Sequence, residues 1–200
     1  MSILKVSRLG HPVLREKARP LTPAFLAKPA TQTLIDNMIE TMIEYHGVGL
    51  AAPQVHESLL LAVIESEGER GRIPLTVLVN PVVTVLGENP DPGMIEDWEG
   101  CLSIPDLRGR VPRYRKLLVD ALDRRGKKMK FVAEGFFARV VQHEYDHLIG
   151  HVYLDRMSDL YTLTHLDEMR RYWLPEGTED DEADTEAKEP VAREASKDTA

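Results

Sequence analysis

Apolar residues recur at helical spacing in the first half of the chain. Between residues 34 and 43 they return every three or four positions, as on a helix with one buried face. Thr31 can cap such a helix at its N-terminus and Gly47 ends the pattern, which predicts a helix over residues 32–45. Residues 1–30 are predicted to be irregular. The prolines at positions 12, 20, 23 and 29 limit any helix in this segment to a turn or two.

Short segments rich in leucine and valine, separated by Gly, Pro, Asp or Asn, are typical of β-strands. The segments with this pattern are residues 59–64, 75–79, 81–86, 117–122 and 128–133. The polar stretch DRRGKK, residues 123–128, separates the last two segments and predicts a hairpin turn between them.

Two further helices are predicted towards the C-terminus. Gly135 precedes a run whose apolar residues return at helical spacing up to Leu148, and Gly150 ends this run. Apolar residues at every third position predict another helix over residues 158–172. Strands in one block with helices at either end favour an α+β fold over alternating βαβ units, and we expect one domain, residues 1–174.

Composition narrows the class of protein. Hydrophobic residues make up 42% and charged residues 29% of the chain, which is ordinary for a soluble globular protein. The longest apolar run, residues 59–64, is far shorter than the roughly 20 residues of a membrane span, and the N-terminus lacks the apolar stretch of a secretory signal. The single cysteine, Cys101, excludes an intramolecular disulfide. These features predict a cytoplasmic protein that does not enter a membrane.

The net charge of −8 is concentrated at the C-terminus. Residues 175–200 hold ten acidic and three basic residues, no aromatic residue and almost no large aliphatic one, which predicts a disordered acidic tail. Residues 1–174 hold 23 acidic and 22 basic residues and are therefore almost neutral. This body lacks the strongly positive surface typical of nucleic-acid binding, so no direct nucleic-acid binding is predicted.

The sequence HEYDH, residues 143–147, carries the clearest chemical signal. It has the form HExxH and falls inside a predicted helix, where the i, i+4 spacing puts both imidazoles on one face. There His143 and His147 can bind one metal ion, and Glu144 can act as general base towards a water molecule. The alternative is a polar helix face with two ordinary histidines.

A catalytic metal site of this kind needs a third protein ligand and one open position. A metzincin would carry a histidine at the position of Tyr153, so that class is excluded. Asp167 and Glu168 follow the HExxH motif at a spacing that suits a thermolysin-like enzyme. Cys101, within EGCLS (residues 99–103), is the other candidate. Spacing alone leaves both alternatives open.

Residues 47–54, GVGLAAPQ, follow the first predicted helix and contain two glycines, two alanines and a proline. One interpretation is a tight loop packed against the core. The other is a loop whose backbone lies along a ligand, with the side-chain amide of Gln54 as a hydrogen-bond donor.

Taken together, these segments resemble the three signature motifs of the peptide deformylases, in the same order and at similar spacing. The motifs are GVGLAAPQ (47–54), EGCLS (99–103) and QHEYDHL (142–148), and the resemblance extends over about residues 3–172 through GHPVLR (10–15), IPDLRGRVPR (104–113) and GHVYLDR (150–156). The resemblance implies an α+β peptide deformylase-like fold, with short antiparallel or mixed sheets packed around a central metal-binding helix.

The resemblance also implies a reaction, the removal of the formyl group from the N-terminal formylmethionine of new polypeptides. The implied metal ligands are Cys101, His143 and His147, holding iron(II) as a rule, with zinc, nickel or cobalt as substitutes. Glu144 is then the general base. The implied donors to the oxyanion are the Gln54 side-chain amide and the Leu102 backbone N–H.

Residues that bind the substrate follow from the same resemblance and from spacing. Val48, Phe136 and Val140 are candidates for the methionine pocket, and the Gly47–Gly49 backbone is expected to pair with the peptide by strand-like hydrogen bonds. Arg108 is a candidate at the mouth of the pocket, with a solvated surface arginine as the alternative.

The expected partners are N-formylmethionyl nascent polypeptides, met near the ribosome exit. An ion pair between Arg113 and Asp146 is predicted to fix the metal-binding helix. Two competing functions are a thermolysin-like endopeptidase and a ribosome-associated metal-binding factor without catalysis. The presence of Glu144 and Gln54 argues against the non-catalytic metal-binding factor, because neither residue is needed merely to hold a metal.

Overall fold

This computed structural model of the chain describes residues 2–68, 70–87 and 93–174, so the predicted acidic tail, 175–200, lies outside the described residues. The helices and strands, in chain order, are η1 (Pro12–Arg15), α1 (Pro23–Leu26), α2 (Pro29–Glu44), β1 (Gly49–Ala51), η2 (Ala52–Val55), β2 (Leu61–Ser66), β3 (Ile73–Val85), β4 (Met94–Cys101), β5 (Ile104–Tyr114), β6 (Lys116–Leu122), β7 (Lys128–Glu134), α3 (Phe136–Leu148), η3 (Tyr153–Arg156), β8 (Thr164–His165) and α4 (Leu166–Tyr172). No helix within these ranges is both long and apolar enough to cross a membrane.

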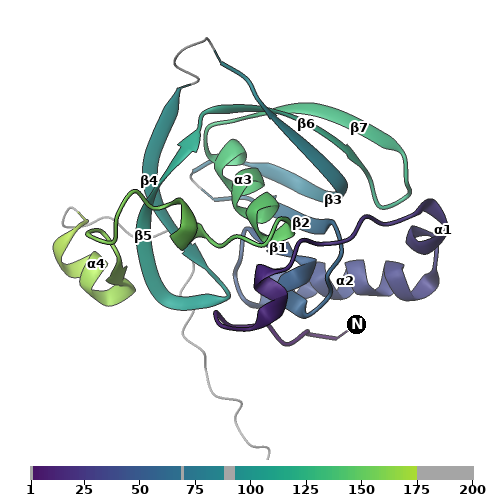
Figure 1. Cartoon of the computed structure of the whole chain (residues 1–200), viewed down its shortest axis with the longest axis horizontal. Helices are drawn as coiled ribbons and strands as arrows, with labels where there is room; N and C mark the ends of the chain where they lie inside the picture. Colours follow the sequence, from purple (N-terminus) through teal and green to yellow (C-terminus); the bar gives the residue numbers. More distant parts are fainter. Residues whose placement is uncertain (1, 69, 88–92, 175–200) are drawn as a thin grey trace, which may run out of the picture.

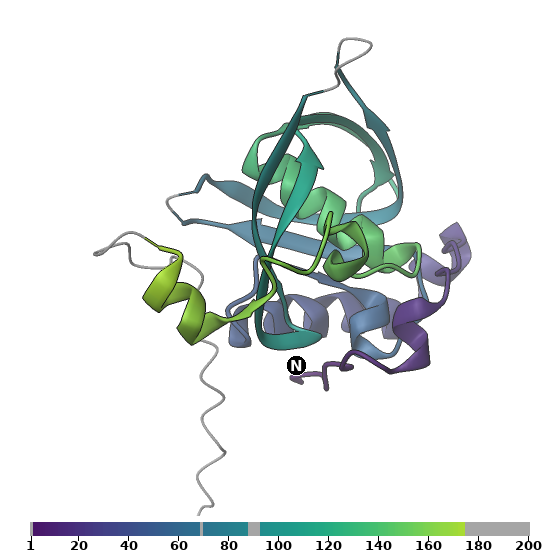
Figure 2. The same ribbon diagram turned by 60° about the vertical axis from the view of Figure 1, so that its left-hand side comes forward.

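The described strands form two antiparallel sheets around one helix. The larger sheet has the strand order β1-β2-β3-β6-β7, and the smaller has the order β4-β5-β8. In Figure 1, α3 lies at the centre, β6 and β7 arch over it, and β4 and β5 stand to its left. Figure 2 shows the same helix between the two sheets from another side. The α+β prediction, with short sheets around a central helix, is confirmed.

Strand β2 of the larger sheet is buried on both faces. Side chains alternate along a strand, so Val63 and Val79 pack in the cluster with α2, whereas Ile64 and Leu78 pack on the other face with α3. A strand covered on both sides needs apolar residues at successive positions. This explains why residues 59–64 form an unbroken apolar run rather than an alternating one.

The first predicted helix, 32–45, is present as α2, but its beginning differs. The helix starts at Pro29, a residue well suited to the first helical position because it has no N–H to satisfy. Thr31 therefore lies inside the helix, and its hydroxyl donates to the Phe25 carbonyl at 2.8 Å. The prediction of Thr31 as the N-cap was wrong, whereas the short turns predicted for residues 1–30 are present as η1 and α1.

Two predicted strands, 75–79 and 81–86, are one continuous strand, β3. The register shifts between Val79 and Val82, where Asn80 adopts a φ of +50°. The Asn80 side chain accepts from the Leu21 N–H and donates to the Leu21 carbonyl, each at 2.8 Å, and so stabilises this bulge. Pro81 marks a bulge rather than the end of a strand, because a bulge tolerates a missing N–H donor.

The prediction of one helix over residues 158–172 was wrong for its first half. Only α4 is helical, and the preceding β8 pairs with β5. The Thr162 hydroxyl accepts from the Arg110 N–H at 3.1 Å, and Leu160 is 65% exposed. Pairing with the edge of β5 therefore overrides the local three-residue repeat. The hairpin predicted around residues 123–128 is confirmed by β6 and β7.

The hairpin of β4 with β5 was not predicted as strands. Its buried positions include the charged residues Glu99, Arg108 and Arg113, so hydrophobic patterning could not reveal it. These strands nevertheless carry several of the residues that surround the pocket described next.

Candidate metal centre

The two histidines of α3 and the cysteine at the end of β4 converge on one point. The i, i+4 spacing places the rings of His143 and His147 with their centres 5.1 Å apart. The His147 Nε2 lies 3.3 Å from the Cys101 Sγ. One ligand atom from each of the three residues lies within 4.8 Å of the other two. This spacing suits three ligands of a single ion.

Asp167 and Glu168, the alternative third ligands, lie elsewhere. Both belong to α4, which packs against β5 on the outer side of the smaller sheet (Figure 1). The Glu168 carboxylate accepts from Arg171 at 3.1 Å. Among the described residues, the group suited to a metal contains Cys101 and neither of these acids. This placement contradicts the thermolysin-like alternative.

The protonation state of the cysteine fits a metal ligand. Burial alone would raise the pKa of the Cys101 thiol, but His147 and His143 outweigh it and hold that pKa well below the ordinary value. The thiolate is the form of cysteine that binds metals. A thiolate with two imidazoles is a donor set that suits iron(II) or zinc.

Glu99 orients one of the histidines. The His143 Nδ1 lies 3.0 Å from the Glu99 Oε2, which directs the other ring nitrogen, Nε2, towards the cysteine. Burial would raise the pKa of Glu99, but hydrogen bonds from His143 and Arg113 hold it well below the ordinary value. The carboxylate is therefore ionised and supports the ligand, as an outer partner of a metal-bound histidine commonly does.

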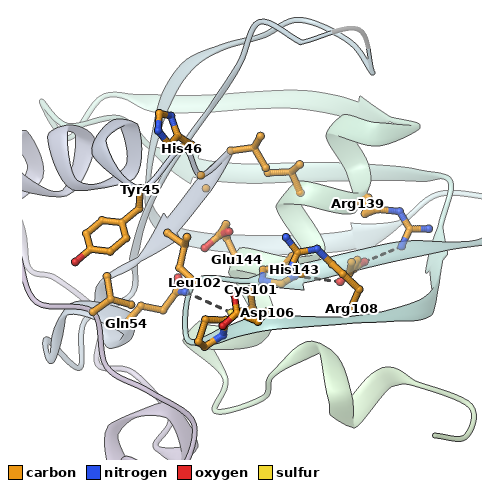
Figure 3. A pocket seen from close by; sticks show the side chains of 18 of the residues that line it. Tyr45, His46, Gln54, Cys101, Leu102, Asp106, Arg108, Arg139, His143 and Glu144 are labelled. Atoms are coloured by element: carbon orange, nitrogen blue, oxygen red, sulfur yellow. Dashed lines mark hydrogen bonds and ion pairs between the residues drawn. The ribbon is translucent and has the colours of Figure 1, made fainter. Parts of the chain in front are cut away.

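The carboxylate of Glu144 lies in the same pocket. Figure 3 shows Glu144, Cys101 and His143 together at its centre, with Gln54 and Tyr45 on one side and Arg108 on the other. The Glu144 side chain is buried, and its Oε2 has no hydrogen-bond partner among the described residues. Burial raises the pKa of Glu144 to about 7, a value that suits a group that accepts and returns a proton near neutrality.

The β1 strand lies directly against Glu144. A Cβ atom added at Gly49 would lie 2.3 Å from the Glu144 Oε1, well inside van der Waals contact. Only glycine therefore fits at this position while the carboxylate keeps its place. The glycine-rich segment 47–54 thus approaches the site closely through its backbone.

Gln54 is held so that its amide nitrogen faces the site. Its Oε1 accepts from the Ala51 N–H at 2.8 Å, and its Nε2 donates to the Ser103 hydroxyl at 3.3 Å and to the Cys101 sulfur at 3.6 Å. Leu102 occupies the short turn that follows the cysteine. Both predicted oxyanion donors therefore lie beside the predicted metal ligand.

A buried network of charges supports the base of the pocket. Arg113 donates two hydrogen bonds of 2.9 Å to Glu99 and one of 2.5 Å to Asp146, so the predicted pair with Asp146 is confirmed. Arg139 donates to Glu99 at 2.7 Å, and Arg156 donates to Asp146 at 2.6 Å. Arg139 and Arg156 were not predicted to take part in this network, because their partners are not neighbours in sequence. Arg139 does stand one helical turn before His143, a predicted ligand.

The pocket is a cavity of about 1050 Å³. All five residues predicted to bind substrate line it, namely Val48, Gly49, Arg108, Phe136 and Val140. Three of these five residues, Val48, Phe136 and Val140, pack in one apolar cluster beside the histidines. Arg108 is buried, and its guanidinium covers Gly100, so the alternative of a solvated surface arginine is wrong.

Other residues of the lining were not predicted. Arg70, from the β2–β3 turn, places its guanidinium 4.3 Å from the ring centre of Phe136. Trp98 and Tyr45 also line the cavity. Trp98 directly precedes the EGCLS segment, which is the one signal in the sequence that could have drawn attention to it.

Comparisons with known proteins agree on one family. The family model described as polypeptide deformylase matches residues 3–162. Peptide deformylase 1 of Bordetella pertussis is 43% identical over 160 residues, which cover 78% of this chain and 88% of that protein. A Met-Ala-Ser-bound class I type b peptide deformylase from Acinetobacter baumannii superposes with a TM-score of 0.71 at 36% identity, covering 78% of this chain and 99% of that one. A peptide deformylase from Thermotoga maritima gives a TM-score of 0.70 at 35% identity, covering 80% of this chain and 100% of that one.

Proposed function

Since this chain belongs to the polypeptide deformylase family, we propose that its pocket is the place where the formyl group is removed from new polypeptides. The protein is a metal-dependent hydrolase that releases formate from N-formylmethionyl chains. The observation that carries this function is the convergence of Cys101, His143 and His147 beside the buried carboxylate of Glu144.

We propose that these three ligands hold one divalent metal ion, with iron(II) as the natural ion and zinc, nickel or cobalt as substitutes. When bound, such an ion lowers the pKa of a water molecule and polarises the formyl oxygen. The soft donor set and the low pKa of the Cys101 thiol support this assignment.

Glu144 is proposed to move the proton. Its carboxylate takes a proton from the attacking water as the water oxygen bonds to the formyl carbon. It then delivers that proton to the amide nitrogen as the carbon–nitrogen bond breaks, giving formate and a free amine. An amine is a poor leaving group without this proton, and burial raises the pKa of Glu144 to about 7, which suits both transfers.

Gln54 and Leu102 are proposed to stabilise the negative charge that develops on the formyl oxygen. The Gln54 amide is fixed by its own acceptor bond to the Ala51 N–H, so its NH₂ group already faces the Cys101 side of the pocket. Donors that are oriented in advance are the effective ones for an oxyanion. The backbone N–H of Leu102 would approach from the neighbouring turn.

The substrate is proposed to bind along β1 with its first side chain in the apolar pocket. Val48, Phe136 and Val140 would contact the methionine, and Arg108 would face the peptide that follows. Since β1 is the edge strand of the larger sheet, an extended peptide can pair with the backbone at Gly49. The Met-Ala-Ser bound to the Acinetobacter baumannii relative supports a peptide of this kind.

We further propose that the protein meets its substrates near the ribosome exit and acts in the cytoplasm, where new polypeptides are made. The direct test of the proposed function uses protein purified without oxygen, with metal analysis and a formyl-Met peptide assay on the same sample. One metal ion per chain and release of formate are expected. A metal-loaded protein that leaves the formyl group in place would refute the function.

Gly49→Ala should lower turnover about 100-fold without loss of metal, because the new methyl group would displace the Glu144 carboxylate by an ångström or more. The measurements are kcat on a formylated peptide and the metal content after dialysis. Gly68→Ala is the matched control, since the nearest atom to its added Cβ is 3.9 Å away. Equal turnover in the two variants would contradict the proposed contact.

Oxidants should distinguish the iron form from the nickel form. Ferrous iron and the Cys101 thiolate are both oxidisable, so the iron form should lose activity in peroxide while the nickel form persists. No disulfide within the chain can protect the sulfur, because Cys101 is the only cysteine. The measurements are deformylation and the mass of the peptide that contains Cys101. Equal survival of both forms with unmodified cysteine would contradict the expected sensitivity.

A further inference from the structure

A second cavity, of about 390 Å³, lies beside the proposed methionine pocket. Its apolar side chains come from Ile73, Val132 and Phe137. Among the described residues, only Arg70 and Phe136 line both this cavity and the larger one that contains the proposed active site. These two side chains therefore form a shared wall between the two cavities.

The guanidinium of Arg70 covers the ring of Phe136. Its carbon lies 4.3 Å from the centre of that ring, within the range of a cation–π contact. Phe136 is half-buried and is the first residue of α3, so no preceding turn of the helix packs against its ring. The guanidinium therefore limits the directions in which the ring can turn.

The guanidinium is itself fixed by the other sheet. Arg70 belongs to the turn between β2 and β3 of the larger sheet, and it forms an ion pair with Asp97 on β4 of the smaller sheet. The Asp97 carboxylate is also held, because its Oδ1 accepts from the Trp98 N–H at 2.8 Å. The ion pair thus joins the two sheets beside the ring of Phe136.

The shared wall lies at the far end of the methionine pocket from the metal ligands. At a rise of 1.5 Å per residue, Val140 stands about 4.5 Å along α3 from His143, and Phe136 stands about 10 Å from it. A side chain longer than methionine would extend towards Phe136. The space behind the ring is ample for extra carbon atoms, since 390 Å³ far exceeds the roughly 30 Å³ that one water molecule occupies.

We infer that Arg70 limits the length of the first side chain of the substrate, because it holds Phe136 as the wall between the methionine pocket and the second cavity. This inference rests on the proposed function and adds an upper size limit to the substrate. Arg70 acts through Phe136 and is therefore a positioning residue. Without its guanidinium the ring can turn aside, and the two cavities join.

The test compares two peptides in the metal-loaded protein. One is formyl-Met-Ala-Ser, and the other has S-propylhomocysteine, whose side chain is two carbons longer, in place of methionine. In the unaltered protein kcat/KM should be at least about tenfold higher for the methionine peptide, as a small size difference in an apolar pocket can produce. In Arg70→Ala this ratio should fall about three- to tenfold. Asp97→Asn, which keeps the acceptor for the Trp98 N–H, should lower it too.

A double-mutant cycle tests whether Arg70 acts through Phe136. Phe136→Ala removes the ring and should lower the ratio on its own. Arg70→Ala added to Phe136→Ala should change the ratio little further, because the side chain that Arg70 positions is then absent. A further fall as large as that of Arg70→Ala alone would contradict the positioning role.

Arg72→Ala is the matched control. This variant removes a cation from the same turn, but Arg72 is exposed, pairs with Glu67 and does not line the methionine pocket, so the ratio should stay unchanged. A ratio near 1 in the unaltered protein, no fall in Arg70→Ala, or an equal fall in Arg72→Ala would overturn the inference. A failure to deformylate the methionine peptide would instead refute the proposed function. The ratio is taken within each variant, so a general loss of activity cancels.

Discussion

Replacing Glu144 by alanine should lower kcat about 100- to 10,000-fold while the protein keeps its metal. The carboxylate is buried beside the ligands but belongs to none of the three ligand positions, so its loss removes the proton transfer and leaves the metal site intact. The measurements are kcat on a formyl-Met peptide and metal content per chain.

Glu144→Gln is the companion variant, because it keeps the shape that packs against Gly49 and removes only the capacity to accept a proton. Both variants should show similar losses. If either kept substantial turnover with normal metal content, the role assigned to Glu144 would have to be abandoned.

Replacing Cys101 by serine should release the metal and with it the activity. The thiolate is the one ligand that the smaller sheet contributes, and a serine hydroxyl stays protonated and binds soft divalent ions poorly. Since removal of an outer partner alone costs about 10- to 100-fold in metal affinity, the loss of the ligand itself should exceed about 100-fold. Metal content after dialysis against a weak chelator measures this directly.

The control for this variant is the double substitution Asp167→Asn with Glu168→Gln. Both acids lie on α4, apart from the three ligands, so this variant should retain metal and turnover. Loss of the metal from the α4 variant, with retention in Cys101→Ser, would restore the thermolysin-like ligand set.

The parts of the fold that hydrophobic periodicity predicted are those buried against apolar neighbours. α2, α3, β2, β6 and β7 were predicted apart from their ends, and α2, β2 and α3 have such surroundings. The β3 strand was predicted as two segments, and β1 was interpreted as part of a loop. The β4–β5 hairpin was not predicted from periodicity, because its buried positions include charged residues such as Glu99 and Arg113, which form a network inside the fold. The segment before α4 was misassigned because Thr162 and its neighbours bond to β5, a contact that no local pattern encodes.

The same distinction between local and distant contacts applies to the site. Spacing within one helix was enough to pair His143 with His147, but the choice between Cys101 and the α4 acids depended on how β4 approaches α3. Cys101 was one of the candidates from the residues alone, and only the family resemblance favoured it over the acids in advance.

The proposed ligands come from two separate layers of the fold, since Cys101 ends a strand of the smaller sheet and the histidines stand on the helix that packs against the larger one. An ion held by all three would act as a cross-link between these layers. The free energy of unfolding then depends on the concentration of free metal, rising by about 1.4 kcal/mol for each tenfold increase above the dissociation constant. Starvation for metal would thus deprive the cell of folded enzyme as well as of activity, because the metal-free chain opens more often to proteases.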